Sequence, residues 1–430
     1  MFERLPECLI IEILSWLPIK SLFQLKSVNK LCYNIIKSPY FISKHLKRNN
    51  DRHNNCIIAQ FVVTQAGELE PSMVWLDDEI DEDNTINSYT TLQNNPPYNY
   101  NICGPCDGLY YVCCLWMGDD WPWSRAGKRC LWNPALNQFK TLPPVIIMKP
   151  CMPSNIEYHY YHEYCGVGFD PITADYKVVL IKGYKDSTDD NDDFPPESFM
   201  NYPLSVLIYS LRNDSWRYVR DLSKTYYLQE NYSYTLVNTS YYWLGSNDEY
   251  PFKYDVIIIF NLATEAIEEI ELPETRLKDS LTFQSYSECL MVYGRTIALV
   301  ALYKDEGNFD IWTLEERSWS KQLSVQLDGL VRNLLGYRCF LGYHPIRENM
   351  VLFRGWRNKL VLYYLDSKES SVLPVIDNDY CRFVATYMES LVPLNDDPEF
   401  WLQWENHRMK GTAKLGSKPD PLEPSLGDSS

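Results

Sequence analysis

Four cysteines within twelve residues form the most chemically suggestive pattern of this sequence. They are Cys103, Cys106, Cys113 and Cys114, and the first two belong to a Cys-Gly-Pro-Cys motif. Such a motif supports thiol–disulfide chemistry when it opens a helix, because the helix N-terminus lowers the pKa of a thiol. Four cysteines can also hold a zinc ion when their side chains converge.

The residues that follow the motif argue against both kinds of site. The turn pair Asp-Gly at 107–108 leads into the strand-like run LYYVCCLW, so no helix would activate the first two thiols. Cys113 and Cys114 would point to opposite faces of that strand, so at most three thiols converge easily. We therefore expect a turn whose thiols fill apolar space, with neither a redox site nor a metal site.

Other residues offer no stronger case for catalysis. His159, His162, Glu163 and Cys165 lie close together, but we interpret their segment as an ordinary loop before the run GVGF. The sequence contains no GxSxG, GxGxxG, P-loop or HExxH motif, and no convincing Ser/His/Asp or paired-carboxylate set. We expect a non-catalytic chain that uses no cofactor.

Charge is distributed unevenly along the chain. The protein has 430 residues and a net charge of −17, which disfavours nucleic acid and anionic membranes as partners. Residues 1–50 carry eight Lys and Arg against three Glu, a balance of +5, so the remainder carries −22. Two parts of opposite sign suggest two roles, and the acidic part favours basic partners.

The N-terminal residues do not have the pattern of a signal peptide. Arg4, Glu7 and Glu12 interrupt any apolar stretch, and no run approaches the roughly 20 apolar residues of a membrane span. We expect an intracellular protein, in the cytoplasm with the nucleus as the alternative. Its 13 cysteines are then expected to be reduced thiols.

Residues 1–48 are predicted to form a small three-helix module. Pro6 can start the first helix, Pro18 ends it and can start the second, and Ser38-Pro39 ends the third. Apolar residues recur at helical spacing in between. Three short helices cannot bury this much apolar surface, so the surplus either packs on the rest of the chain or docks another protein. Periodicity alone leaves both alternatives open.

The module resembles an F-box over residues 4–46. The resemblance is carried by Leu-Pro at 5–6, Ile-Leu at 13–14, Leu-Pro at 17–18, Lys30, and Pro-Tyr-Phe at 39–41. It implies binding to a Skp-type adaptor, and through it to a cullin-based ubiquitin ligase. The implied adaptor-binding residues are Leu5, Pro6, Leu9, Ile13, Leu14, Leu17, Pro18, Leu22, Leu25, Val28, Lys30 and Cys32. Cys32 departs from the family, which usually has Trp there.

The remainder repeats a unit of strand, polar turn and strand. Six copies cover residues 131–144, 167–181, 206–219, 257–273, 309–325 and 360–375. Their turns begin near Asn133, Asp170, Ser210, Asn261, Thr313 and Tyr364, at steps of 37, 40, 51, 52 and 51 residues. A repeat of this length predicts a six-bladed, kelch-like β-propeller, with five or seven blades or a large β-sandwich as alternatives.

This part resembles the plant F-box-associated domain over residues 100–393. The matching runs are GPCDGL, WNPALNQFKTLP, GVGFDPITADYKVV, YSLRNDSWR and IFNLATEAIEEIELP, in the order that the family uses. GPCDGL and FDIW further resemble the S-locus F-box branch. That branch implies capture of basic, secreted pistil ribonucleases in pollen self-incompatibility.

Substrate contacts are expected in loops of the acidic part. Two acidic runs suit electrostatic steering of a basic protein, although solvated loops are the simpler interpretation. Two tryptophans are candidate anchors or core residues. The candidate residues are Asp77, Asp78, Glu79, Asp81, Glu82, Asp83, Trp121, Trp123, Asp189, Asp190, Asp192 and Asp193.

The sequence thus predicts an α+β multidomain protein. The expected parts are an F-box module (1–48), a linker with first strands and an acidic loop (49–100), the propeller (101–395) and a largely disordered tail (396–430). Its expected role is substrate recognition for a ubiquitin ligase. The alternatives are a scaffold with a degenerate F-box and, more remotely, a glycan-active propeller enzyme.

Overall fold

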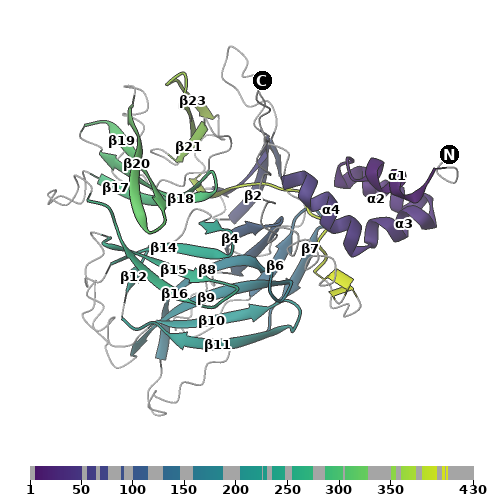
Figure 1. The fold of residues 1–430 in the computed structure, drawn as a ribbon, viewed down its shortest axis with the longest axis horizontal. Helices are drawn as coiled ribbons and strands as arrows, with labels where there is room; N and C mark the ends of the chain where they lie inside the picture. Colours follow the sequence, from purple (N-terminus) through teal and green to yellow (C-terminus); the bar gives the residue numbers. More distant parts are fainter. Residues whose placement is uncertain are drawn as a thin grey trace, which may run out of the picture.

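A computed structural model places a helical module beside a larger all-β domain (Figure 1). The structure describes residues 5–50, 56–63, 68–75, 89–91, 100–114, 129–145, 158–186, 204–224, 226–229, 235–246, 254–274, 286–303, 306–327, 350–354, 360–373, 380–394, 400, 401, 403 and 404. In this part of the chain, no helix is both long and apolar enough to cross a membrane.

The helical module contains four helices, so the prediction of three was wrong. They are α1 (Glu7–Leu14), α2 (Ile19–Val28), α3 (Lys30–Lys37) and α4 (Pro39–Asn50). Ser38-Pro39 ends α3 as expected, but Pro39 also occupies the first position of α4, where its missing N–H costs nothing. The Ser38 hydroxyl then accepts the N–H of Phe41 at 3.2 Å and caps the new helix.

Polar contacts fasten α1 to α4. The Glu12 carboxylate pairs with both Lys44 and Arg48. The Arg48 guanidinium also lies over the Trp16 ring, 4.2 Å from its centroid. These contacts hold α1 and α4 together although the two helices are far apart in the sequence.

The all-β domain consists of six antiparallel sheets within the described residues. Three of them are ordered β4-β5-β6-β7, β8-β9-β10-β11 and β12-β14-β15-β16, with β13 also paired to β14. Their strands are β4 (Tyr100–Cys106), β5 (Leu109–Cys114), β6 (Arg129–Asn133), β7 (Gln138–Thr141), β8 (Tyr158–Asp170), β9 (Asp175–Asp186), β10 (Ser205–Ser210), β11 (Ser215–Asp221), β12 (Tyr227–Leu228), β13 (Leu236–Val237), β14 (Ser240–Ser246), β15 (Val256–Asn261) and β16 (Ile267–Glu271).

The other three sheets include one that joins the two ends of the domain. Two are ordered β17-β18-β19-β20 and β21-β22-β23, and the third is β24-β1-β2-β3, in which β24 pairs antiparallel with β1. Their strands are β17 (Tyr286–Tyr293), β18 (Thr296–Tyr303), β19 (Asn308–Glu315), β20 (Ser318–Gln326), β21 (Met350–Arg354), β22 (Leu360–Tyr364), β23 (Ser370–Leu373), β24 (Tyr380–Thr386), β1 (Cys56–Val63), β2 (Glu68–Trp75) and β3 (Tyr89–Thr91).

All six predicted hairpins are confirmed, but they do not represent six sheets. Asp170 and Ser210 end strands of two hairpins, β8–β9 and β10–β11, that lie in the same sheet. None of the six predicted turns lies in the sheet that contains β24 and β1, because the strands of that sheet come from opposite ends of the domain. The repeat therefore predicted the hairpins correctly and assigned them to sheets incorrectly.

Side chains at the strand ends explain why these turns recur. The Asn133 side-chain oxygen accepts the N–H of Leu136 at 3.3 Å, and Asp170 accepts that of Ile172 at 2.8 Å. Asn261 similarly accepts the N–H groups of two residues within its turn, both at 2.9 Å. Such contacts stabilise tight turns, so the repeated Asn or Asp after an apolar strand is a mechanistic turn signal.

Aromatic residues beyond position 395 belong to the packed domain. Phe400, Trp401 and Trp404 are buried, and the Trp401 and Trp404 rings lie 6.5 and 6.3 Å from the Tyr176 ring. They occupy the start of the predicted tail 396–430, so the core extends past the predicted boundary. Residues 405–430 lie outside the described residues.

We expect Trp404→Ala to lower the free energy of unfolding by about 3–5 kcal/mol, because it empties a fully buried aromatic site. Urea unfolding would measure the change, with Gln403→Ala as the exposed neighbouring control. Equal stability of the two variants would contradict the packing of this segment.

Candidate functional site

Helix α1 carries apolar side chains on both of its faces. Ile10 and Leu14 are fully buried, whereas Leu9 and Ile13 on the other face of α1, and Trp16 in the turn that follows the helix, are 48%, 47% and 53% exposed. These three residues recur at spacings of four and three, so they form one strip, named the α1 strip, along the helix and the turn after it. A strip of this kind is suited to docking another protein.

Further exposed apolar side chains continue around the module. Val28 at the end of α2 is 73% exposed, and Phe23, Tyr33 and Tyr40 are also exposed. The buried face of the module belongs to one hydrophobic cluster with residues of the all-β domain, including Leu391 and Val392. Part of the apolar surplus therefore packs on the rest of the chain, as one of the two alternatives predicted, and part of it faces outward.

Two lysines lie against the exposed aromatic rings. Lys26 lies 4.6 Å from the centroid of the Phe23 ring, and Lys37 lies 4.9 Å from that of Tyr33. Burial lowers the pKa of Lys26, and the charge of Lys37 lowers it further. The two cations repel each other, so this surface favours an acidic partner.

The CGPC motif forms the last four residues of β4, and Asp107-Gly108 makes the predicted turn into β5. Gly104 has a φ of +122°, and a Cβ there would lie 3.0 Å from Val167 and 3.1 Å from the Leu109 carbonyl. Only glycine fits this position without strain. Strand β5 follows the motif, as the sequence predicted.

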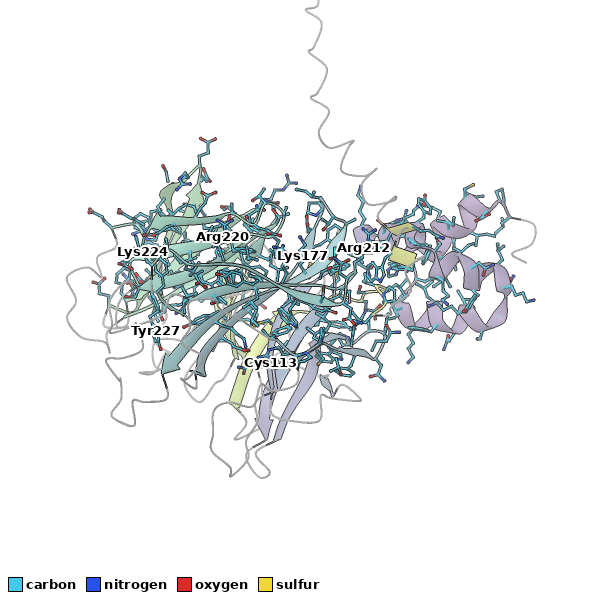
Figure 2. The ribbon with its side chains drawn as sticks, turned by 90° about the horizontal axis from the view of Figure 1, so that it is seen from below. Cys113, Lys177, Arg212, Arg220, Lys224 and Tyr227 are labelled. Carbon is cyan, nitrogen blue, oxygen red and sulfur yellow. A yellow bond between two sulfur atoms is a disulfide. The ribbon has the colours of Figure 1, made fainter. Side chains whose placement is uncertain are left out.

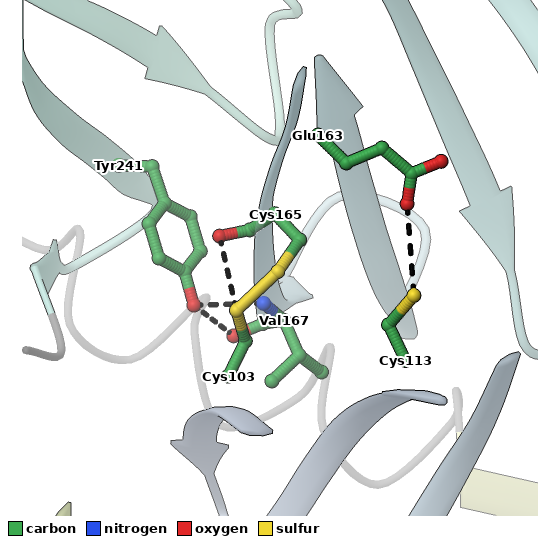
Figure 3. The surroundings of a disulfide bond; sticks show 6 residues. All are labelled: Cys103, Cys113, Glu163, Cys165, Val167 and Tyr241. Carbon is green, nitrogen blue, oxygen red and sulfur yellow. Dashed lines mark hydrogen bonds between the residues drawn. A yellow bond between two sulfur atoms is a disulfide. The ribbon is translucent and has the colours of Figure 1, made fainter. Parts of the chain in front are cut away.

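The expectation of 13 reduced thiols is wrong for one pair, because Cys103 and Cys165 form a disulfide (Figure 3). Strands β4 and β8 belong to neighbouring sheets, and their packing brings the two Cα atoms to 6.6 Å. Beside the pair, the Tyr241 hydroxyl donates to the Val167 carbonyl at 2.6 Å and accepts its N–H at 2.8 Å. The disulfide therefore lies in a tightly bonded contact between sheets.

Glu163 is part of strand β8 rather than of the predicted loop. Its carboxylate pairs with Lys182 at 2.7 Å and with Arg129, and the Lys182 side chain is fully buried. The Cys113 thiol donates to the other carboxylate oxygen at 3.7 Å (Figure 3). Among the described residues, no group of three or more His, Cys, Asp or Glu could hold a metal ion.

The Glu163 cluster is a network of three charged groups. Burial alone would raise the pKa of Glu163, but Lys182 and Arg129 outweigh it and lower that pKa. The carboxylate therefore stays ionised and acts as the fixed counter-charge of the buried Lys182. The cluster ties β6 to β8 and β9, which belong to two different sheets.

Comparison with known families agrees with this two-part architecture. A model of the F-box domain matches residues 2–44, and a model of the F-box associated beta propeller domain matches residues 59–377. The chain belongs to the plant F-box proteins with an F-box-associated domain.

Curated relatives match nearly the whole F-box chain. The F-box protein CPR1 of Arabidopsis thaliana is 25% identical over 401 residues, which cover 90% of this chain and 88% of the relative. F-box protein At4g22390 of the same plant is 23% identical, with coverage of 74% and 73%. Membership of this family supports a substrate-receptor role in ubiquitin ligases.

Two of the solved structures that match this chain show only a distant similarity to it. An oligogalacturonate lyase in complex with manganese has a TM-score of 0.41 and 10% identity, with coverage of 75% of this chain and 77% of the lyase. An exo-beta-1,3-galactanase from Phanerochaete chrysosporium has a TM-score of 0.35 and 9% identity, with coverage of 66% and 63%. Likeness at this level says nothing about activity.

The predicted adaptor-binding residues of the F-box divide by burial. Leu14, Leu22 and Cys32 are buried, so they support the module from inside. Leu17 and Leu25 are half-buried, and the exposed residues are Leu5, Pro6, Leu9, Ile13, Pro18, Val28 and Lys30. The predicted adaptor-binding set does not include the exposed Trp16, Phe23, Tyr33 and Tyr40, although Trp16 continues the α1 strip just beyond the helix.

The predicted substrate contacts lie outside the described residues. This applies to Asp77, Asp78, Glu79, Asp81, Glu82, Asp83, Trp121, Trp123, Asp189, Asp190, Asp192 and Asp193.

We expect Glu163→Gln to lower the free energy of unfolding at pH 7 by about 3 kcal/mol, because buried Lys182 loses its counter-charge. In the folded protein, the pKa of the Glu163 carboxyl lies below its ordinary value of 4.5. The stability that ionised Glu163 contributes is therefore fully present above pH 4.5 and is lost as the pH falls through the folded pKa. Urea unfolding at several pH values would test this, with exposed Glu315→Gln as control. Identical pH profiles for the native protein and Glu163→Gln would contradict it.

Proposed function

We propose that this protein is the substrate-recognition subunit of a Skp–cullin–F-box ubiquitin ligase. The observation that carries the proposal is the exposed α1 strip of Leu9, Ile13 and Trp16, within a module that matches the F-box family. The strip would dock a Skp-type adaptor, which in turn contacts a cullin. The all-β domain would hold the target protein, and the chain itself would perform no chemistry.

Bringing two sites together explains how a non-catalytic subunit promotes a reaction. A target held by the all-β domain meets the ubiquitin donor at a high effective concentration, because both belong to one assembly. Position and orientation then replace acid–base chemistry in this chain. We place this assembly in the cytoplasm, with the nucleus as the alternative.

We further propose that the six sheets are the blades of a kelch-like β-propeller. Three observations support this arrangement: the sheets are antiparallel, they mostly follow chain order, and β24 closes on β1. Contacts between β4 and β8, β24 and β4, and β14 and β17 join strands of different sheets. Such contacts are typical of strands around a shared axis.

The substrate that we propose is a basic protein. The charge of −22 on residues 51–430 favours capture of a cation-rich surface. The likeness of GPCDGL and FDIW to the S-locus branch supports a finer proposal, in which pistil ribonucleases are captured in pollen. The finer proposal is supported by these two sequence motifs and by the negative charge of residues 51–430.

The competing function is a scaffold with a degenerate F-box. Cys32 in place of the usual Trp motivated this alternative. Cys32 is buried, so the substitution changes the interior of the module and leaves the exposed strip intact. This placement favours the adaptor-docking proposal over the scaffold.

We expect Ile13→Asp to abolish capture of a plant Skp-type adaptor. An unpaired charge in the docked strip would weaken binding by roughly a hundredfold or more. The matched control is Ile172→Asp, because Ile172 is a 57% exposed isoleucine in the β8–β9 turn of the all-β domain. Pull-down and titration calorimetry with the purified adaptor would measure both variants.

The controls separate the two functions. Far-ultraviolet circular dichroism and urea unfolding would establish that each variant is folded. Loss of binding only in Ile13→Asp supports the ligase role, whereas a folded native chain that captures no adaptor supports the scaffold.

Neutralising the acidic run 77–83 with Asn and Gln should slow capture of a basic ribonuclease at low salt. Electrostatic steering raises association rates and is screened by salt, so the difference should disappear at high ionic strength. Stopped-flow association would measure the rates, with Glu315 and Glu316 neutralised as the exposed control. Unchanged association rates would exclude this run as the steering element.

A further inference from the structure

Helix α2 begins without a cap from its own module. Its N-cap residue is Pro18, which offers no side-chain acceptor, and its first turn contains no acidic residue. The N–H of Ile19 instead donates to the Glu389 carboxylate at 2.9 Å, across a separation of 370 residues. A carboxylate at this position satisfies an orphan donor and complements the positive end of the helix.

Glu389 also contacts a second helix of the F-box. The Asn49 side-chain amide, buried near the end of α4, donates to the Glu389 backbone carbonyl at 3.0 Å. One half-buried residue therefore bonds the start of α2 and the end of α4. Both bonds would be lost if the module rotated away from the all-β domain.

The segment around Glu389 is itself fixed on the all-β domain. We name residues 387–394 the coupling segment. The fully buried Asn133 side chain donates to the carbonyls of Ser390 and Val392, at 3.1 and 2.8 Å. The N–H of Leu394 donates to the Gln138 side chain at 3.1 Å. Residues of β6 and β7 thus hold the coupling segment directly after Glu389.

The β4–β5 turn fits against the coupling segment without spare space. A Cβ on Gly108 would lie 2.5 Å from the Ser390 Cβ and 2.6 Å from the Met388 carbonyl oxygen. Gly108 also has a φ of +75°, which side chains disfavour. The coupling segment follows β24 and passes between the F-box helices and the sheets (Figure 1). It is therefore bonded to both parts of the molecule.

We propose that Glu389 is a positioning residue that sets the orientation of the F-box relative to the substrate-binding domain. This inference rests on the proposed ligase function, because orientation decides which lysines face the ubiquitin donor. The exposed α1 strip does not include Glu389 or its partners. Loss of the Glu389 contacts should therefore change the orientation of the F-box relative to the all-β domain and leave the affinity for the adaptor unchanged.

The first experiment measures orientation in the full chain without any partner. Dyes on engineered residues at Asn34 in α3 and at Lys224 would report the separation of the two parts. Figure 2 shows Lys224 at the end of the all-β domain that lies away from the helices. Native protein and the Glu315→Ala control should give one narrow energy-transfer distribution, whereas Glu389→Ala should give a broader or shifted one.

Two further readouts distinguish positioning from general destabilisation. Amide hydrogen exchange at Ile19 should rise about tenfold in Glu389→Ala, because the cap of α2 is lost. Glu389→Gln retains an acceptor oxygen and should restore most of the native distribution. An unchanged distribution in folded Glu389→Ala would overturn the inference.

The second experiment tests the consequence for ubiquitin transfer. The chain, assembled with adaptor, cullin and a charged conjugating enzyme, serves as its own substrate, and mass spectrometry measures modification of the exposed Lys224, Lys321 and Lys368. Adaptor affinity of Glu389→Ala should stay within about twofold of native. The share of modification among these lysines should change at least threefold.

The outcomes separate failure of this inference from failure of the proposed function. Native adaptor binding with an unchanged lysine pattern in Glu389→Ala would overturn the positioning role. Absence of adaptor binding by the native chain would overturn the ligase function and with it the transfer half of the inference. The dye measurement would still decide whether Glu389 couples the two parts.

Discussion

The antiparallel pairing of β24 with β1 is the contact on which the arrangement of both parts depends. It places Thr386 opposite Ile57, and the coupling segment continues from there toward the helices. A slip of one residue in this register would move Glu389 by about 3.3 Å along the chain. The N–H of Ile19 and the Asn133 side chain would then lose their acceptors. The pairing that closes the sheet therefore also determines the orientation of the F-box.

The F-box can expose large apolar residues because it does not depend on its own core alone. Its buried residues Ile10, Leu14 and Ile36 belong to the same hydrophobic cluster as Leu391 and Val392 of the coupling segment. A four-helix module of this size would be marginal in isolation. The shared core supports its fold, and the outward face of α1 remains available for a partner.

Local signals in the sequence predicted local structure well. Asn133, Asp170 and Asn261 marked turns because their side chains bond the turn itself, and each hairpin followed. Helical spacing identified apolar positions but could not tell the buried Leu14 from the exposed Ile13, since both faces of α1 are apolar. The contacts that sequence reasoning missed join distant residues: Cys103 with Cys165, Arg129 with Glu163, and Ile19 with Glu389. No periodicity records such pairs, because sheet packing creates them.

The capping of α2 by a residue so far along the chain has a consequence for biosynthesis. Ile19 of the F-box is synthesised well before Glu389, whose carboxylate follows 370 residues later. At about 5–20 residues per second, the nascent module waits roughly 20–70 s for that residue. The F-box can therefore reach its final orientation only after β24 has been synthesised and has paired with β1. Translation products that end before Glu389 would carry an F-box that lacks this contact.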